Sequence, residues 1–217
     1  CLDCHDPHGA PGQGLLVAGG HAPYLNGQCD ACHAGSSGGD LIAAEPDLCT
    51  ACHADKTGLA DRVHPHDPAS SGSCTTCHAP HTGQGKGILK EEPVKLCGAC
   101  HDGLTVAAGT DSILSVHAPF GTQECFNCHD AHGSDQAALL KMEPGPLCAS
   151  CHAEVDSLVQ GAKVPHPAME AMTCGECHAP HASMQPKLLR EAEATTCAKC
   201  HDEPQAKLGD KFVHLPF

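Results

Sequence analysis

Apolar residues occur in this sequence as short groups. The longest apolar stretches are brief, such as "LLVAGG" at residues 15–20. None approaches the roughly 18 residues of a membrane-spanning helix. Apolar pairs recur seven residues after a histidine, at Leu15-Leu16, Ile88-Leu89, Leu139-Leu140 and Leu188-Leu189. The pattern predicts a repeated unit built from short elements, with no membrane span.

Composition makes an ordinary hydrophobic core improbable on physical grounds. Gly and Pro contribute 23 and 17 of the 217 residues, which disfavours long helices. The chain has no Trp, and its aromatic residues are Tyr24, Phe120, Phe126, Phe212 and Phe217. We therefore expect mostly irregular backbone with short helices, little or no β-structure, and a core supplied by cofactors, metals or disulfides.

The net charge of −14 argues against nucleic acid as a partner, because no basic stripe is present to neutralise phosphates. The charge is consistent with a soluble, extracytoplasmic protein. The sequence begins inside a motif, "CLDCH", so we expect a processed chain from which export signals have been removed.

All 18 cysteines lie in CxxC pairs, and a histidine follows every pair directly. The cysteines are Cys1, Cys4, Cys29, Cys32, Cys49, Cys52, Cys74, Cys77, Cys97, Cys100, Cys125, Cys128, Cys148, Cys151, Cys174, Cys177, Cys197 and Cys200. The following histidines are His5, His33, His53, His78, His101, His129, His152, His178 and His201.

Disulfides and zinc sites use cysteine pairs but do not require this histidine. Covalent c-type haem requires all three residues: two thiols for the vinyl groups and an imidazole for the iron. The motifs therefore predict nine covalently bound c-type haems, with these histidines as proximal iron ligands. Acylation of Cys1 as a lipoprotein is the alternative at that position, but Cys1 completes a haem motif and we prefer haem.

The motifs are of two kinds. The first kind reads H-x7-CxxCHxxH, with an upstream and a downstream histidine, and the second kind is a plain CxxCH that starts at Cys49, Cys97, Cys148 or Cys197. The step from first to second kind is 23 residues in three repeats and 20 in the repeat at Cys29, where Ser36 replaces the downstream histidine. This alternation predicts a lone haem module at residues 1–28 and haem-pair repeats at 29–73, 74–124, 125–173 and 174–217, packed as one continuous unit.

A downstream histidine lies three residues after a proximal one, on the same face of a helical turn. It cannot reach the far side of the same iron, so we expect it to bind a neighbouring haem. The ten remaining histidines are the predicted distal ligands: His8, His21, His64, His66, His81, His117, His132, His166, His181 and His214. Ten suffice for nine irons, so bis-histidine coordination is expected throughout. Met172 is the methionine best placed to bind an iron, but we do not predict that it does so.

Two ligand assignments stay open. His64 and His66 lie in "VHPHDP", whose prolines hold the segment extended. We expect His66 to serve the Cys74 haem. His64 serves the Cys49 haem unless His8 does so, and one of these two is spare.

His214 lies in "KFVHLPF", which is similar to "LSVHAPF" around His117. No motif follows His214, and the Cys1 motif lacks an upstream histidine. We expect His214 to ligate the Cys1 haem of another copy, which generates a head-to-tail filament unless the contact closes into a ring. Folding back within its own chain is the alternative.

The alternation of CxxCHxxH and CxxCH resembles the doubled-CxxCH multihaem c-type cytochromes over essentially the whole chain. With the terminal histidine, it is similar to members that polymerise as extracellular cytochrome filaments, or nanowires. The resemblance implies an exported protein that relays electrons between redox cytochromes or to an extracellular acceptor. Alternatives are a periplasmic electron shuttle, a charge-storage or docking protein, and a multihaem enzyme with an open iron.

Overall fold

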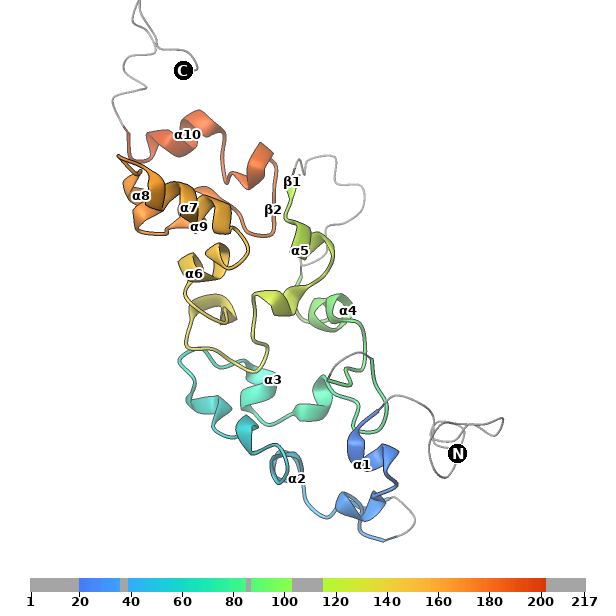
Figure 1. Ribbon diagram of the computed structural model, residues 1–217. Helices are drawn as coiled ribbons and strands as arrows, with labels where there is room; N and C mark the ends of the chain where they lie inside the picture. Colours follow the sequence, from blue (N-terminus) through green and yellow to red (C-terminus); the bar gives the residue numbers. More distant parts are fainter. Residues whose placement is uncertain (1–19, 36–38, 85–86, 103–114, 202–217) are drawn as a thin grey trace, which may run out of the picture. The chain divides into compact units, whose positions relative to one another are not determined.

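The computed structural model describes residues 20–35, 39–84, 87–102 and 115–201. In these residues the chain is mostly irregular, with short helices and one very small sheet, which confirms the fold class expected from composition (Figure 1). The α-helices are α1 (Ala22–Leu25), α2 (Asp47–Thr50), α3 (Asp67–Ser70), α4 (Pro93–Gly98), α5 (Ala118–Gly121), α6 (Pro144–Ala149), α7 (Ala153–Gly161), α8 (Pro167–Glu170), α9 (Cys174–Cys177) and α10 (Glu193–Ala198). The 3-10 helices are η2 (Cys29–Ala31), η3 (Ala54–Lys56), η4 (Leu59–Asp61), η5 (Cys74–Thr76), η6 (Cys125–Asn127), η7 (Ala137–Leu139) and η8 (Pro186–Leu188).

Each upstream histidine is the N-cap of a one-turn helix. His21, His66, His117 and His166 precede α1, α3, α5 and α8, and each of these helices has Pro in its first two positions. Pro suits the first helical turn, where no amide hydrogen is needed for the ladder. The four histidines have extended backbone, so a tight turn begins directly after each one.

The CxxCH motifs form helical turns. First-kind cysteine pairs begin η2, η5, η6 and α9, whereas second-kind pairs lie at the ends of α2, α4, α6 and α10. The histidine amide donates to the carbonyl of the first cysteine, as in His78 to Cys74 and His152 to Cys148, both 3.0 Å. Residues three and four apart share one face of a helical turn. Each motif therefore presents two thiols and an imidazole on one side.

The sheet consists of β1 (Ser115–Val116) and β2 (Ala182–Ser183), which pair antiparallel. Single bridges join each first-kind proximal histidine to a leucine further along, as in His78 with Leu89 and His178 with Leu189. The single bridges close the loops after the CxxCHxxH motifs. The sheet instead joins two segments that lie far apart in the sequence.

The chain forms two compact units. The first comprises residues 1–105 and 129–140, and the second comprises 106–128 and 141–217. The loop at 129–140, which follows the Cys125 motif, therefore belongs to the unit of the preceding repeats.

The polypeptide encloses almost no core of its own. Among the described residues, the only buried side chains larger than glycine are Leu89, at 9% exposure, and Ser134, at 6%. Burial of apolar area is the main favourable term in folding. The described chain therefore needs apolar mass that its own side chains do not supply.

Candidate haem-binding sites

None of the sixteen cysteines in the described part of the chain forms a disulfide bond. Within each compact unit, thiols of consecutive motifs lie close together. Cys49 interacts with Cys74 by a side-chain hydrogen bond and with Cys32 electrostatically, and burial followed by these neighbours raises the pKa of Cys49 to about 11. The thiols of Cys148 and Cys174 are paired in the same way, and Cys128 also lies near Cys148.

This proximity orders the motifs in space. Burial and the neighbouring Cys100 thiol raise the pKa of Cys77, so the Cys74 and Cys97 motifs are also adjacent. The motifs at 29, 49, 74 and 97 follow one another in the first unit, and those at 125, 148 and 174 do so in the second. For the motifs linked in this way, neighbours in the sequence are also neighbours in space.

Counted from its upstream histidine, a repeat begins at His21, His66, His117 or His166. In each repeat counted in this way, the second-kind proximal histidine faces the upstream histidine. The ring centres are about 6 Å apart in all four pairs: His21 with His53 at 5.8 Å, His66 with His101 at 6.0 Å, His117 with His152 at 6.1 Å and His166 with His201 at 6.0 Å. The first three pairs are nearly parallel, at 20–22°, whereas the last is tilted by 59°.

First-kind proximal histidines pair across repeats. His33 faces His81 at 5.8 Å, and His78 faces His132 at 5.9 Å with an interplanar angle of 2°. His78 and His81, three residues apart, thus belong to two different pairs. That a downstream histidine binds a neighbouring haem stays a prediction, and the two pairs are the arrangement it requires.

The pair geometry fits an iron held between two imidazoles. Metal–nitrogen bonds of about 2 Å on each side place the ring centres about 6 Å apart. By comparison, Phe120 and His181, which no metal can join through both rings, are only 4.7 Å apart. A CxxC pair accompanies every proximal histidine, so the residues present fit covalently bound haem with two axial imidazoles.

Backbone carbonyls fix the tautomer of the ligand histidines. Nδ1 of His78, His129 and His178 lies 2.6, 2.8 and 2.9 Å from the carbonyl oxygen nine residues later. A ring that donates from Nδ1 leaves Nε2 free to bind a metal. Burial is also the main cause that lowers the pKa of His21 and His132, which favours the neutral, ligating form.

These carbonyls come from an unusual turn. Ala138 and Leu139 have φ of 55° and 57°, and Lys187 and Leu188 have φ of 56° and 59°. Non-glycine residues pay a steric cost of about 1–2 kcal/mol in this left-handed region. Ser134 and Ser183 support the turns by donating to the carbonyls of Leu140 and Leu189. The turn explains the recurrent apolar pair in the sequence, whose structural role could not be inferred from its spacing.

The Cys29 repeat has a shortened version of this loop. His33 bridges Leu41, eight residues on, whereas His78, His129 and His178 bridge leucines eleven residues on. The difference of three residues accounts for the 20-residue step that replaces 23 in this repeat. Nδ1 of His33 is buried and has no hydrogen-bond partner among the described residues. No carbonyl in the described part of this loop takes the place of the one that lies beside the His78, His129 and His178 rings.

His66 does not face the proximal histidine that was predicted as its partner. It faces His101 of the Cys97 motif, and its Nδ1 lies 2.7 Å from the Ala131 carbonyl, so its assignment to the Cys74 haem is corrected. The Ala131 carbonyl, from the following repeat, holds the His66 ring where it faces His101.

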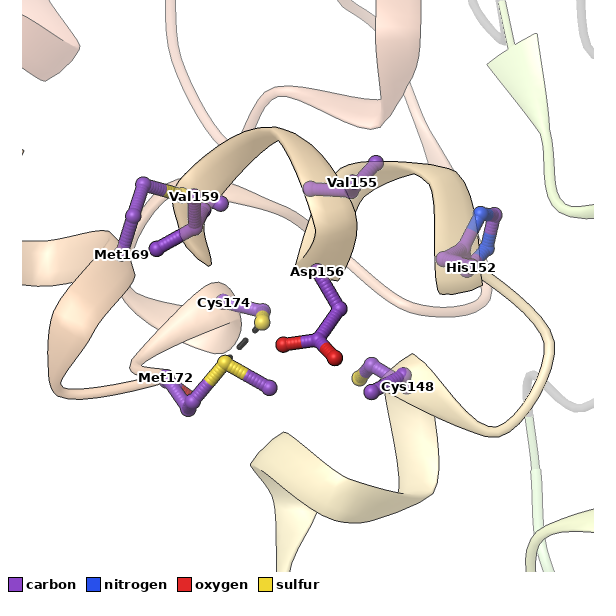
Figure 2. Close-up of a pocket in the computed structure, with 9 residues that line it drawn as sticks. Cys148, His152, Val155, Asp156, Val159, Met169, Met172 and Cys174 are labelled. Atoms are coloured by element: carbon purple, nitrogen blue, oxygen red, sulfur yellow. Dashed lines mark hydrogen bonds between the residues drawn. The ribbon is translucent and has the colours of Figure 1, made fainter. Parts of the chain in front are cut away.

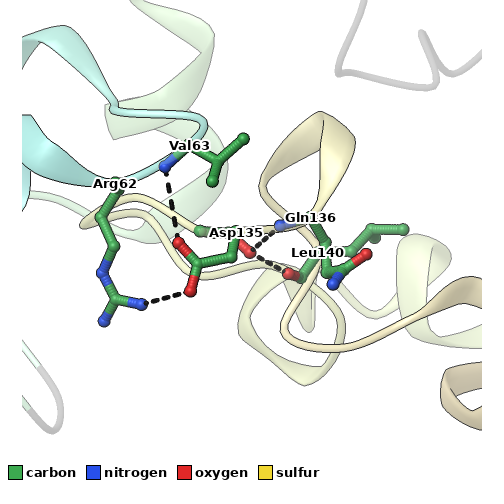
Figure 3. Close-up of polar contacts among 6 residues, drawn as sticks. Arg62, Val63, Asp135, Gln136 and Leu140 are labelled. Carbon is green, nitrogen blue, oxygen red and sulfur yellow. Dashed lines mark hydrogen bonds and ion pairs between the residues drawn. The ribbon is translucent and has the colours of Figure 1, made fainter.

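His64 has a backbone role in the structure. Its amide and carbonyl pair with Ser134 at 2.8 and 3.0 Å, as Ser115 pairs with Ser183 in the sheet. Its side chain is exposed, and no second imidazole faces it in the described part of the chain. The neighbouring Arg62 and Val63 bind the carboxylate of Asp135, 3.3 Å from the guanidinium and 3.5 Å from the amide (Figure 3). The proposed ligation of the Cys49 haem by His64 is corrected, because His21 faces His53 there.

An apolar pocket lies beside the Cys148 motif (Figure 2). It is lined by Cys148, Ala149, His152, Val155, Asp156, Val159, Met169, Met172 and Cys174. Figure 2 shows Asp156 of α7 directed between the two thiols, and Gln160 donates to its carboxylate at 2.7 Å. Met172 faces the pocket as lining, and the facing imidazole of the Cys148 motif is His117.

The remaining predicted residues lie outside the described part: Cys1, Cys4, His5, His8, Ser36 and His214. In the described residues no helix is long and apolar enough to cross a membrane. The same residues contain no cluster of three or more His, Cys, Asp or Glu suited to an isolated metal ion.

Repeated CxxCH motifs whose cysteines form no disulfide in the described residues define the chain as a multihaem c-type cytochrome. The chain matches the family described as "Doubled CXXCH motif" over residues 1–20, 21–58, 66–105, 117–157 and 166–206, and it belongs to this family. Four of the matched segments start at or directly before an upstream histidine, so one family unit contains that histidine and both motifs. No curated protein matches the chain.

Proposed function

We propose that this protein is a nonahaem cytochrome that conducts electrons through closely spaced bis-histidine haems, as an extracellular head-to-tail filament. The observation that carries the proposal is the alternation of two imidazole pairings, one within a repeat and one between repeats. A haem held by two imidazoles accepts and releases one electron at iron.

The chain would supply attachment, axial ligands and close spacing. Cysteine pairs would bind the porphyrins, and paired imidazoles would occupy both axial sides. Histidines three residues apart, such as His78 and His81, would hold two haems nearly in contact. Contacts between thiols of consecutive motifs support a path that follows the sequence.

Electron transfer is proposed over catalysis because paired imidazoles leave no axial position for a substrate. The six imidazole pairs in the described residues involve six of the nine proximal histidines. An enzyme of this class would need one iron with an open side.

Mass spectrometry and low-temperature electron paramagnetic resonance test the haem part of the proposal. We expect a mass increment of nine haems per chain and low-spin ferric signals that added cyanide or nitrite leaves unchanged. A mass equal to the bare polypeptide, or high-spin signals from most of the haems, would contradict it.

The assembly proposal adds a ligand in trans. We propose that His214 binds the Cys1 haem of the next copy, which continues the haem path across the junction. The partners would be copies of this chain and redox cytochromes or acceptors outside the cytoplasm. Cryo-electron microscopy tests this arrangement, and isolated monomers at every concentration would contradict it.

A further inference from the structure

The first three repeats in the described chain are each completed by a loop from the following repeat. We call this the donor loop, defined as four residues of which the second is the downstream histidine: 80–83, 131–134 and 180–183. Three contacts recur where a donor loop meets the preceding repeat. Each contact involves a different part of the loop.

The first contact is the imidazole pair between repeats. His81 faces His33, and His132 faces His78, always with the donor in the later repeat. The second contact is a hydrogen bond to an upstream histidine ring. The rings of His66 and His117 lie 2.7 and 2.8 Å from the carbonyl oxygens of Ala131 and Pro180, and the His21 ring bonds the backbone of Pro80.

The third contact is a short backbone edge. The residue two positions before the upstream histidine forms a backbone pair with the residue two positions after the downstream histidine. Ser115 pairs with Ser183 in this way, and His64 pairs with Ser134. These contacts leave the receiving side chains at least partly covered: His21, His66, His117, His33 and His78 are all half-buried.

The fourth repeat presents the same three groups uncovered. His178 and His166 are exposed, unlike their counterparts. No second imidazole in the described part of the chain faces His178, although its Nδ1 is fixed by the Lys187 carbonyl. Nδ1 of His166 meets only the amide of Ala168, at 3.3 Å. Val164, which corresponds to Ser115, is 89% exposed and forms no backbone hydrogen bond with any described residue.

The tilt of the His166–His201 pair also indicates that the donor-loop contact is missing among the described residues. In the three repeats whose upstream ring is fixed by a donor-loop carbonyl, the interplanar angle is 20–22°. Without that carbonyl, His166 is tilted by 59° against His201. The edge formed by Val164, His166 and His178 is therefore an acceptor that no donor loop covers among the described residues. We call it the acceptor edge.

We infer that the acceptor edge binds the segment "PHGA", residues 7–10, of a second copy of this chain. His8 would be the second axial ligand opposite His178, the Pro7 carbonyl would accept from His166, and Ala10 would pair with Val164. The segment follows a CxxCH motif in the sequence and repeats the Pro-His dipeptide of the donor loops at 80–83 and 180–183.

The direction of the series selects a second copy. In every observed contact the donor loop follows the receiving repeat in sequence, and residues 7–10 precede all of the described repeats. Joining unlike surfaces of two copies gives a head-to-tail assembly. This inference rests on the proposed haem binding, and it adds a second ligand in trans at the same junction as His214.

His8→Ala tests the inference, with His64→Ala as the matched control. In His8→Ala we expect full haem content, a high-spin signal equal to one haem per chain, and loss of assembly in light scattering and electron micrographs. Added imidazole should restore the low-spin signal but leave assembly impaired. His64→Ala should match the unmodified protein.

Val164→Pro changes the acceptor edge without removing a ligand, and it should weaken assembly at least tenfold. Unchanged assembly and spin state in His8→Ala would overturn the inference. Fully low-spin monomers of the unmodified protein would also overturn it, because the ligand would then come from the same chain. Absence of haem, or of low-spin iron generally, would instead refute the proposed function.

Discussion

At the residue scale, the structure separates histidines that look alike in sequence. His64 and His66 are two residues apart and equally suited to bind metal, yet only His66 faces a proximal histidine. The nine CxxCH sites can be predicted from sequence because the chemistry is local. The partner of each proximal histidine cannot, because it depends on how loops distant in sequence pack together.

Replacement of His66 by Ala should convert one haem per chain to high spin, because the imidazole that faces His101 is lost. Magnetic circular dichroism would count the high-spin haem. The His64→Ala protein is the control and should keep every haem low-spin. An equal effect in the two variants would show that the assignment of His66 is wrong.

The left-handed turns make a second prediction at this scale. Lys187 has φ of 56°, so Lys187→Gly should raise the free energy of unfolding by roughly 0.5–1 kcal/mol. Ala149→Gly at the end of α6 removes a side chain from a helical position with ordinary backbone angles. This change should lower the free energy of unfolding by about 0.5–1 kcal/mol. Chemical denaturation of the holoprotein measures both values. A loss of stability in Lys187→Gly would mean that side-chain contacts outweigh the backbone strain.

At the element scale, one-turn helices place ligands, and loops join repeats. Proline in the first turn fixes each upstream histidine as an N-cap, which "HAPY", "HDPA", "HAPF" and "HPAM" already suggest in the sequence. The three-residue shortening after Cys29 was visible only as a changed step between motifs. The bridge between His33 and Leu41 places the shortening in the loop between these two residues.

Helix α7 is the longest described helix, and it brings a carboxylate into an apolar pocket. Asp156→Asn should raise the midpoint potential of the Cys148 haem, because a nearby negative charge stabilises the ferric state. The expected shift is tens of millivolts, the order of a screened charge interaction of about 1 kcal/mol. Spectroelectrochemical titration would detect it. Asp61→Asn on η4 removes the same charge elsewhere and should leave that potential unchanged, so equal shifts in both variants would refute a local effect.

At the scale of the whole molecule, an ordinary core is replaced by a series of cofactor sites. Composition predicted this, because five aromatic residues and no Trp cannot fill an interior. The order of sites within each unit follows the chain, which could not be inferred from motif spacing alone. It rests on the thiol contacts of Cys49, Cys77 and Cys148.

Because the haem sites follow one another in sequence order, we expect electron transfer across a unit to need each interior site. Cys49→Ser with Cys52→Ser should lower the haem content by one and slow electron exchange across the first unit at least tenfold, because the Cys49 motif lies between those at 29 and 74. Conductance of protein films and stopped-flow reduction measure the change. Thr50→Ala, inside the same motif, is the control. Unchanged rates in the double variant would indicate a branched path.

The donor loop has an evolutionary consequence. The first three repeats each receive a loop from the next repeat, and the last three each give one to the repeat before. A duplicated inner repeat therefore brings both matching surfaces with it. One whole repeat is 51 residues long from Cys74 to Cys125 and 49 residues long from Cys125 to Cys174. Duplication or deletion of such a repeat in the gene would preserve the donor-loop contacts on either side. Family members should therefore differ in length by whole repeats, and single repeats cut from the array should fail to fold alone.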